Sequence, residues 1–234
     1  RQAQAIINEW QLSHPDIPRV GRVEAVTRFY YNPELQSRFY MIPGVVVMML
    51  TMISMLLTGM AVVKEKEIGT LEQLMVTPLT PLQLVIGKTV PFTVLAYIAL
   101  TIASTVAVLW YRLPLAGSVF TLAGSAMVFL LVTLGGGLLV STISHTQQQA
   151  MFTIWFFMVF AILTSGFFFP IANMPEPVQW LTYLNPLRYF MAVVRGVFLR
   201  GSTFADLLPQ LLPLAALGVV TFTAAALRFK KTVT

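Results

Sequence analysis

Long apolar stretches separated by short polar ones dominate the sequence. No Asp, Glu, Lys or Arg occurs in 39–63, 90–111, 113–175 or 207–227. A helix rises about 1.5 Å per residue, so about 20 apolar residues cross the ~30 Å hydrocarbon core of a bilayer. The third stretch is too long for one helix, and a polar patch at 141–149 divides it. The pattern therefore predicts an all-α polytopic membrane protein with five spans, near 39–63, 84–111, 119–140, 150–169 and 207–227.

Composition and charge support this interpretation and orient the chain. Charged residues make up 10% of the chain, against about 25% in soluble domains. The net charge of +6 does not indicate nucleic-acid binding, because all the lysines lie in two segments, 64–88 and 230–231. Five spans place these segments on one side of the membrane, and the positive-inside rule makes that side the cytoplasm. The C-terminus is then cytoplasmic and the N-terminal segment outside.

The first 38 residues differ in composition from the rest. They are rich in arginine and acids, and 22–31 alternates β-branched, aromatic and polar residues before Asn32 and Pro33. This pattern predicts a strand, and we expect 1–38 to be the C-terminal remnant of an extracytoplasmic domain whose beginning is missing. The chain has no cysteine, which excludes disulfides and cysteine metal sites.

A charged stretch at 64–89 interrupts the apolar pattern. Its end, Gly87-Lys88-Thr89, resembles the end of a phosphate-binding loop, but that loop requires a further glycine where this chain has Leu82. Nucleotide binding is therefore not expected here. We interpret Lys88 as a residue at the membrane surface whose amine reaches the headgroups.

The same stretch contains signals for a short helix. Thr70 and Gln73 have the spacing of a capping box, and Pro78 ends the helical segment. A second box with a proline at the first helical position, Pro81, begins the next span. A helix at 71–76 is too short to be stable alone. It must lie on the membrane surface or dock on a partner, and its acid, Glu72, favours a partner because surface helices usually carry basic residues.

Several motifs resemble the ABC-2 type export permeases, the membrane subunits of bacterial drug-resistance type ABC exporters. The first motif is EKEIGTLEQLMVTPL at 65–79, and a second block comprises SGFFFP at 165–170, Met174-Pro175, NPLRYF at 185–190 and Arg195. YNPE at 31–34 adds to the likeness, which covers nearly the whole chain. Members of this branch have six spans with a large extracytoplasmic domain after the first. Since this chain has five predicted spans and a short segment before them, we expect it to be part of a longer protein.

The resemblance implies a partner and a mechanism. Such permeases work as dimers with a second copy or a paralogue, each bound to an ABC ATP-binding subunit on another chain. ATP and Mg would be bound there, so this chain would carry no cofactor, metal or catalytic residue. The protein would lie in the bacterial inner membrane, and the 64–80 loop would be its cytoplasmic coupling loop. The coupling residues would be Glu65, Glu67, Gly69, Thr70, Leu71, Glu72, Gln73 and Leu74.

Two of the predicted spans carry stripes that could line a substrate path. Methionines and small polar residues follow helical spacing in 39–63, and phenylalanines do so in 150–169. Ordinary helix packing explains such stripes equally well. If the stripes instead form a pliable path for an apolar or amphipathic substrate, the residues that would line it are Thr51, Met52, Ser54, Met55, Thr58, Phe152 and Phe156.

The segment 174–200 is too interrupted by proline and charge to cross the membrane. Trp180 and Tyr183 suit a membrane interface. We expect short re-entrant helices that gate the outer face, with a plain surface loop as the alternative. The candidate gate residues are Pro170, Pro186, Arg188, Tyr189 and Arg195. His145 is expected to be an ordinary solvated residue.

Other classes of membrane protein remain as alternatives. An ion-coupled secondary transporter usually places ionisable residues inside the bilayer, and none of the five predicted spans has one near its centre. A passive channel without an ATPase partner is not excluded by composition. A membrane enzyme would need a catalytic cluster, and Glu65 with Glu67 lacks metal ligands or a nucleophile.

Overall fold

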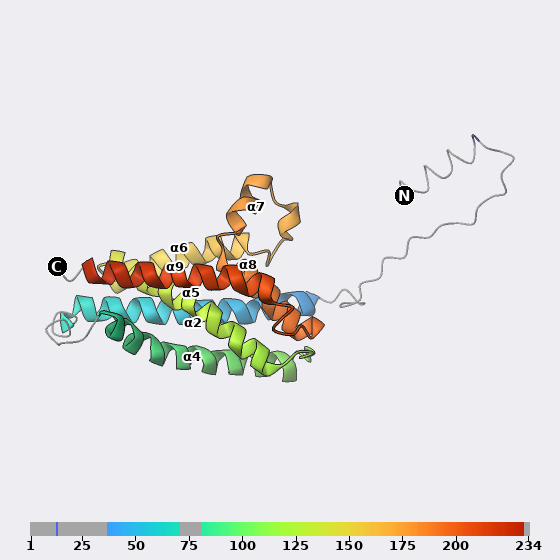
Figure 1. Cartoon of the computed structure of the whole chain (residues 1–234), viewed down its shortest axis with the longest axis horizontal. Helices are drawn as coiled ribbons and strands as arrows, with labels where there is room; N and C mark the ends of the chain where they lie inside the picture. The colour runs from blue at the N-terminus through green and yellow to red at the C-terminus, as the bar shows by residue number, and fades with distance from the viewer. Residues whose placement is uncertain (1–12, 14–36, 71–80, 232–234) are drawn as a thin grey trace. The chain divides into compact units, whose positions relative to one another are not determined.

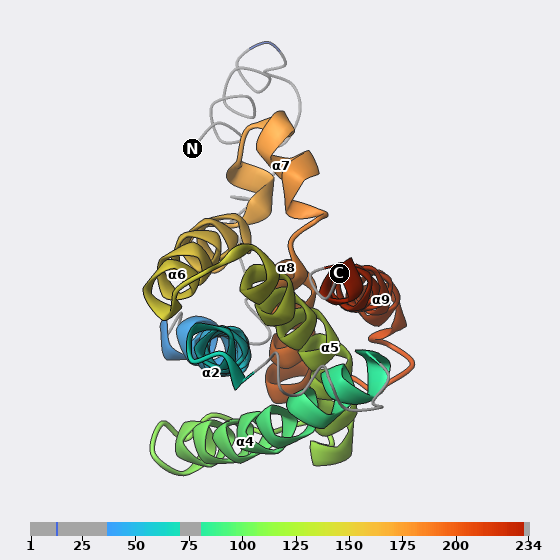
Figure 2. The same ribbon diagram turned by 90° about the vertical axis from the view of Figure 1, so that its left-hand side faces the viewer.

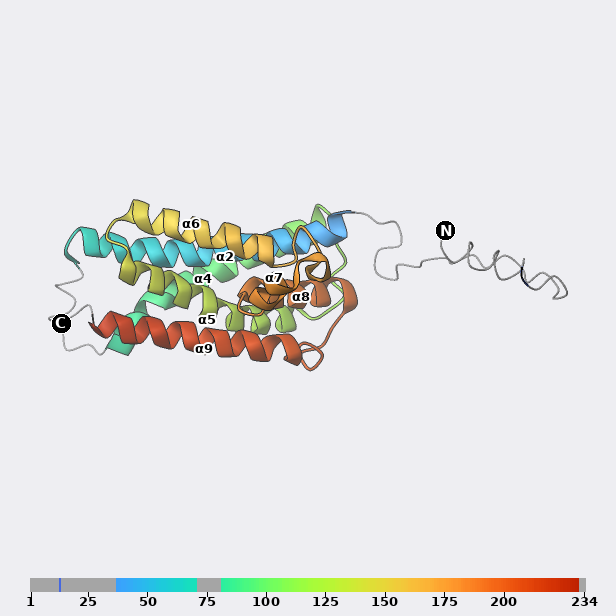
Figure 3. The same ribbon diagram turned by 90° about the horizontal axis from the view of Figure 1, so that it is seen from above.

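The computed structural model describes residues 13, 37–70 and 81–231. Five long helices make up most of this region: α2 Ser37–Glu67, α4 Pro81–Leu109, α5 Val119–Ile143, α6 Gln147–Thr164 and α9 Leu208–Lys231. Each is long and apolar enough to cross a membrane. They run side by side along one axis (Figures 1 and 3). The predicted all-α protein with five spans is confirmed. The strand expected at 22–31 and the helix expected at 71–76 lie outside the described residues.

The helices differ from the predicted spans by a few residues at their ends, and two of these differences have a clear local cause. α2 continues past residue 63 to Glu67, so the charges that begin the polar stretch lie in its last turn. α6 stops at Thr164 rather than near 169, where Ser165 caps it and Gly166 takes a φ of 79°. The positive φ favours glycine and turns the chain out of the helix.

Most residues of the polar patch at 141–149 belong to the ends of two helices, and few of them form a loop. α5 runs to Ile143, and α6 begins at Gln147. The side chain of Thr146 accepts a hydrogen bond from the backbone N–H of Gln149, as an N-cap does. Short polar side chains therefore appear here because they cap helices, and the connection itself takes only a few residues.

α5 is the central helix of the bundle and packs between α2 and α9 (Figure 2). Small residues allow this close approach. A Cβ atom on Gly137 would lie 2.7 Å from the carbonyl oxygen of Met55, and one on Gly135 would lie 3.0 Å from the backbone nitrogen of Phe222. Because membrane helices associate by close packing rather than by exclusion of water, such glycines help to determine the arrangement.

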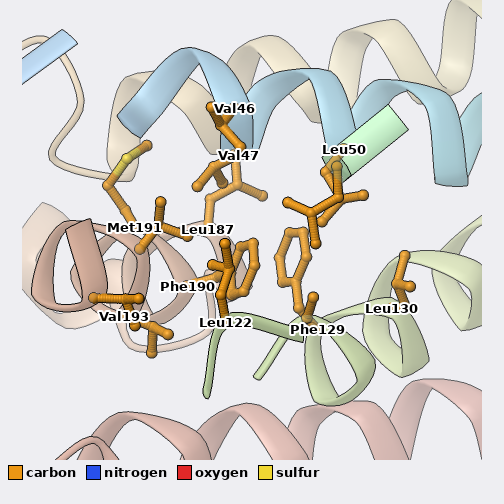
Figure 4. Close-up of a cluster of buried hydrophobic side chains, with 14 of the residues drawn as sticks. Val46, Val47, Leu50, Leu122, Phe129, Leu130, Leu187, Phe190, Met191 and Val193 are labelled. Carbon is orange, nitrogen blue, oxygen red and sulfur yellow. The ribbon is translucent and has the colours of Figure 1, made fainter. Parts of the chain in front are cut away.

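Four short helices connect α6 to α9: η1 Ile171–Asn173, α7 Glu176–Thr182, α8 Pro186–Arg195 and η2 Gly196–Arg200. α7 lies beside the bundle, whereas α8 enters it (Figure 2). Phe190 of α8 stacks on Phe129 of α5 with ring centroids 4.1 Å apart, within a buried cluster that includes Val47 and Leu50 of α2 (Figure 4). α8 thus forms part of the core.

Asn185 fixes the start of α8. Its Oδ1 accepts a hydrogen bond from the backbone N–H of Leu187, and Pro186 occupies the first helical position. Its Nδ2 donates to the carbonyl oxygen of Ala161 at 2.6 Å and to the hydroxyl of Thr164 at 2.9 Å. One side chain therefore caps α8 and attaches it to α6.

Candidate functional site

The last turn of α2 contacts three other parts of the bundle. Glu65 forms an ion pair with Lys88 of α4. The Nζ of Lys66 donates to the carbonyl oxygen of Ser144, after α5, at 3.1 Å. The carboxylate of Glu67 accepts from Gln147 twice, from its backbone N–H at 3.0 Å and from its Nε2 at 2.6 Å. The helix end that precedes the predicted coupling segment is thus attached to α4, to α5 and to the first residue of α6.

The chain leaves α2 at Gly69, which has a φ of 75° and no atom within 4 Å of an added Cβ. The hydroxyl of Thr70 donates to the carbonyl oxygen of Glu65 at 3.2 Å. Of the predicted coupling residues, Glu65, Glu67, Gly69 and Thr70 therefore gather at this helix end. The other four, Leu71, Glu72, Gln73 and Leu74, lie outside the described residues.

An apolar groove of about 320 Å³ lies between α6 and α9. α2 and α5 also line it, with Met55 and Thr133 among the lining residues, as do several residues of 181–187, from α7 to the start of α8. Its few polar side chains include Thr51, Thr164 and Thr221. Such a surface suits an apolar or amphipathic molecule better than an ion.

The predicted path residues do not gather in this groove as one set. Thr51 and Met55 line it. Ser54 and Thr58 are fully buried, and the hydroxyl of Ser54 donates to that of Thr133 at 2.8 Å, joining α2 to α5. The remaining three are exposed on the bundle surface, namely Met52, Phe152 and Phe156.

The groove residues that could not be identified from the sequence come from the start of α8 and from α9. Asn185, Leu217 and Thr221 line it, but they are distant in sequence from the methionine stripe. No spacing along one helix relates them to it, since the groove exists only after α6, α8 and α9 pack together. The one local signal was the Asn-Pro pair at the start of α8.

A second cavity, of about 600 Å³, lies among the start of α2, the chain after α6, α8 and the start of α9. Four of the predicted gate residues line it, namely Pro170, Arg188, Tyr189 and Arg195. The fifth, Pro186, lines the apolar groove instead. His145 is exposed, and its backbone N–H donates to the side chain of Gln149. Among the described residues no group of three or more His, Cys, Asp or Glu side chains could hold a metal ion.

Comparison with known proteins agrees with this architecture. Residues 21–199 match the model of the ABC-2 type transporter family. The chain is 36% identical over 216 residues to the probable multidrug ABC transporter permease YbhR of Escherichia coli K12, covering 92% of this chain and 59% of YbhR. It is 35% identical over 199 residues to the probable multidrug ABC transporter permease YbhS of the same strain, covering 85% of this chain and 53% of YbhS.

A third relative is more distant. The inner membrane transport permease YhhJ of Escherichia coli K12 is 28% identical over 215 residues, covering 90% of this chain and 57% of YhhJ. The chain thus spans between half and two thirds of the length of these relatives. The family match extends from the N-terminal segment into η2, and the chain belongs to the ABC-2 type transporter family.

Proposed function

We propose that this chain is the membrane-spanning part of an ATP-driven exporter in the bacterial inner membrane. A separate ABC ATP-binding subunit docks on the 64–80 loop, and a second copy or a paralogue completes a dimer. The N-terminal segment lies outside and the C-terminus in the cytoplasm. Support comes from the family and from the names of the relatives, two of which are named probable multidrug ABC transporter permeases.

The observation that carries the proposal is the attachment of the last turn of α2. A push on the residues after Gly69 would act first on this turn. The Glu65–Lys88 pair would transmit it to α4, and the paired contacts of Glu67 with Gln147 would transmit it to α6. α2 and α6 both line the apolar groove. The ATP-binding subunit would change the groove only if its contacts with this end of α2 differ between its ATP-bound and ATP-free states.

The groove suits the export of an apolar or amphipathic substrate. Its lining residues include four leucines, two methionines and two phenylalanines, together with four threonines. Flexible methionines adapt to differently shaped apolar ligands. Met55 and Phe157 are therefore the path residues with the strongest structural support, while Met52, Phe152 and Phe156 could reach a substrate only on the outer surface of the bundle.

An ion-coupled transporter or a passive channel is the alternative. The acidic and basic side chains in the described spans lie toward helix ends, as Arg38, Lys64, Lys88 and Arg228 do. A proton or ion relay would instead need such groups at membrane depth. This distribution favours an energy source outside the chain.

The test is Leu74→Asp, which places a charge on the apolar face of the expected coupling helix. Burying a leucine contributes about 1.5–3 kcal/mol, so we expect about a tenfold to hundredfold loss of affinity for the ATP-binding subunit. Gln148→Asp, at an exposed position in the first turn of α6 and outside the coupling residues, adds the same charge as the matched control and should retain the subunit. Co-purification from detergent, with inserted permease quantified in parallel, gives the result.

Normal insertion with loss of the subunit and of permease-dependent ATP hydrolysis is the expected outcome. If Leu74→Asp retains the subunit and ATP hydrolysis as the control does, the 71–76 segment is a surface helix, and the ATP-driven mechanism loses its main support.

A further inference from the structure

The cavity of about 600 Å³ beside α8 has an unusual lining for a site near a membrane. It combines two guanidinium groups, from Arg188 and Arg195, with three tyrosines, Tyr40, Tyr183 and Tyr189. No Asp or Glu is among its described lining residues. The volume lies within the range of ordinary small-molecule pockets, about 300–1,000 Å³.

Arg195 is held in place by Tyr40 but uses few of its donors. Its guanidinium carbon lies 3.9 Å from the centroid of the Tyr40 ring, and Nη2 donates to the Tyr40 carbonyl oxygen at 3.4 Å. The Tyr40 hydroxyl in turn donates to the carbonyl oxygen of Gly166 at 2.7 Å, which fixes the ring. The Nε atom is buried without a hydrogen-bond partner. A guanidinium has five N–H donors, so most of its capacity is unused.

Arg188 is similarly oriented by aromatic rings. Its guanidinium carbon lies 4.0 Å from the Tyr183 ring centroid and 5.9 Å from that of Tyr189, and Nη1 donates to the hydroxyl of Thr182. The Tyr189 hydroxyl donates to the carbonyl oxygen of Tyr183 at 2.8 Å. Cation–π contacts hold the side chain without neutralising it.

The acids of the outer segments do not neutralise these charges in the described part of the chain. Asp206 accepts hydrogen bonds from the amide and the hydroxyl of Thr203, and Glu176 is exposed on α7. The ion pair found in the described ranges, Glu65–Lys88, is near the opposite end of the bundle. Two partly buried cations without an acid are costly unless an anion accompanies them.

The surroundings favour an anion that carries an apolar tail. Exposed apolar side chains flank the cavity in sequence, Phe168 and Phe169 after α6 and Leu208 and Leu212 on α9. Exposed Trp180 and Tyr183 on the α7 side are typical of the membrane interface. Arginine binds phosphate through paired, charge-assisted hydrogen bonds.

We propose that this cavity binds the phosphate group of a phospholipid headgroup in the adjacent leaflet, with Arg188 and Arg195 as its ligands. The acyl chains would lie along the exposed apolar residues of α9 and of the segment after α6. A bound lipid would then join α2, α8 and α9 at this end of the bundle. The proposal does not rest on the ATP-driven mechanism and can be tested without the ATP-binding subunit.

The experiment measures binding of dioctanoyl phosphatidylglycerol to the detergent-purified protein by native mass spectrometry. Dioctanoylglycerol, which lacks the phosphate, shows how much the acyl chains contribute to binding. Millimolar inorganic phosphate, added as a competitor, shows whether a free anion occupies the same site. Arg188→Gln and Arg195→Gln are compared with Arg112→Gln, which removes the same charge from an exposed position after α4. Arg195→Lys tests whether charge alone suffices. Circular dichroism confirms that each variant is folded.

We expect Arg188→Gln and Arg195→Gln each to raise the dissociation constant for phosphatidylglycerol about tenfold, while Arg112→Gln changes it less than twofold. Dioctanoylglycerol should bind weakly to every variant, and inorganic phosphate should not displace the lipid. If Arg195→Gln does not fold, Arg188→Gln decides the question. Equal lipid binding by Arg188→Gln and Arg112→Gln overturns the proposal. If millimolar phosphate displaces the lipid, the proposal that a lipid supplies the bound phosphate is overturned, and the cavity is a site for a free anion.

Discussion

Replacing Gly137 by alanine should weaken the crossing of α2 and α5. The added Cβ would lie 2.7 Å from the carbonyl oxygen of Met55 and 3.2 Å from the backbone nitrogen of Gly59, where ordinary contacts begin at 3.4 Å. Both neighbours are backbone atoms, so no side chain can rotate away and the helices must separate by several tenths of an ångström. Overpacking of this kind costs about 1–3 kcal/mol.

A compensating gain has to be subtracted from that cost. Alanine is a better helix former than glycine by about 0.8–1.0 kcal/mol, so the net loss should be about 0–2 kcal/mol. Gly87→Ala in α4 is the matched control, because nothing lies within 4 Å of its added Cβ and only the gain applies. The difference between the two variants isolates the steric term, about 1–3 kcal/mol.

Thermal unfolding in detergent measures this difference. We expect a lower Tm for Gly137→Ala than for Gly87→Ala, and a larger drop for Gly137→Leu. Since Met55 lines the apolar groove, the same change should alter substrate-dependent ATP hydrolysis. A Tm of Gly137→Ala equal to or above that of Gly87→Ala would refute the close α2–α5 approach.

Three further predictions concern coupling, path and topology. Glu67→Ala removes both contacts with Gln147 and should lower permease-dependent ATP hydrolysis and export while the protein stays folded and keeps its ATP-binding subunit; unchanged coupling would contradict the proposed transmission. Met55→Ala should change which substrates stimulate ATP hydrolysis more than Met52→Ala or Phe156→Ala, which are exposed; equal losses of folded yield in all three would indicate packing alone. Single cysteines in this cysteine-free chain should react with an impermeant thiol reagent added outside only at positions 118 and 202, and with the reagent from the cytoplasm only at 70 and 145; outside labelling at 70 would reverse the topology.

The five spans could be predicted because lipid imposes a local rule. The apolar segments long enough to cross the bilayer had to become helices, and hydropathy with the polar patch at 141–149 located their ends within a few residues. α2 and α6 differed at their ends for local reasons that hydropathy does not contain. Charged residues continue the helix of α2 to Glu67, and a glycine with positive φ ends α6 before the apolar run does.

The groove and the place of α8 could not be predicted in the same way. The methionines of 39–63 and the phenylalanines of 150–169 each have helical spacing, but spacing does not say which face of a helix meets a neighbour. Ser54 and Thr58 turned out to be buried between helices, whereas Phe156 is 68% exposed. The prolines and arginines of 174–200 correctly excluded a span, yet the burial of α8 depends on Phe190 meeting Phe129, a contact between distant parts of the chain.

A photo-crosslinking amino acid at position 74 tests the central claim most directly. In membranes that also contain the ATP-binding subunit, illumination should join the permease to that subunit, and the yield should change when ATP is added. The same amino acid at Phe120, exposed at the start of α5, should give no such product. A permease that is fully inserted, yet crosslinks at position 74 only to lipid or to nothing, would contradict docking of an ATP-binding subunit on the 64–80 loop.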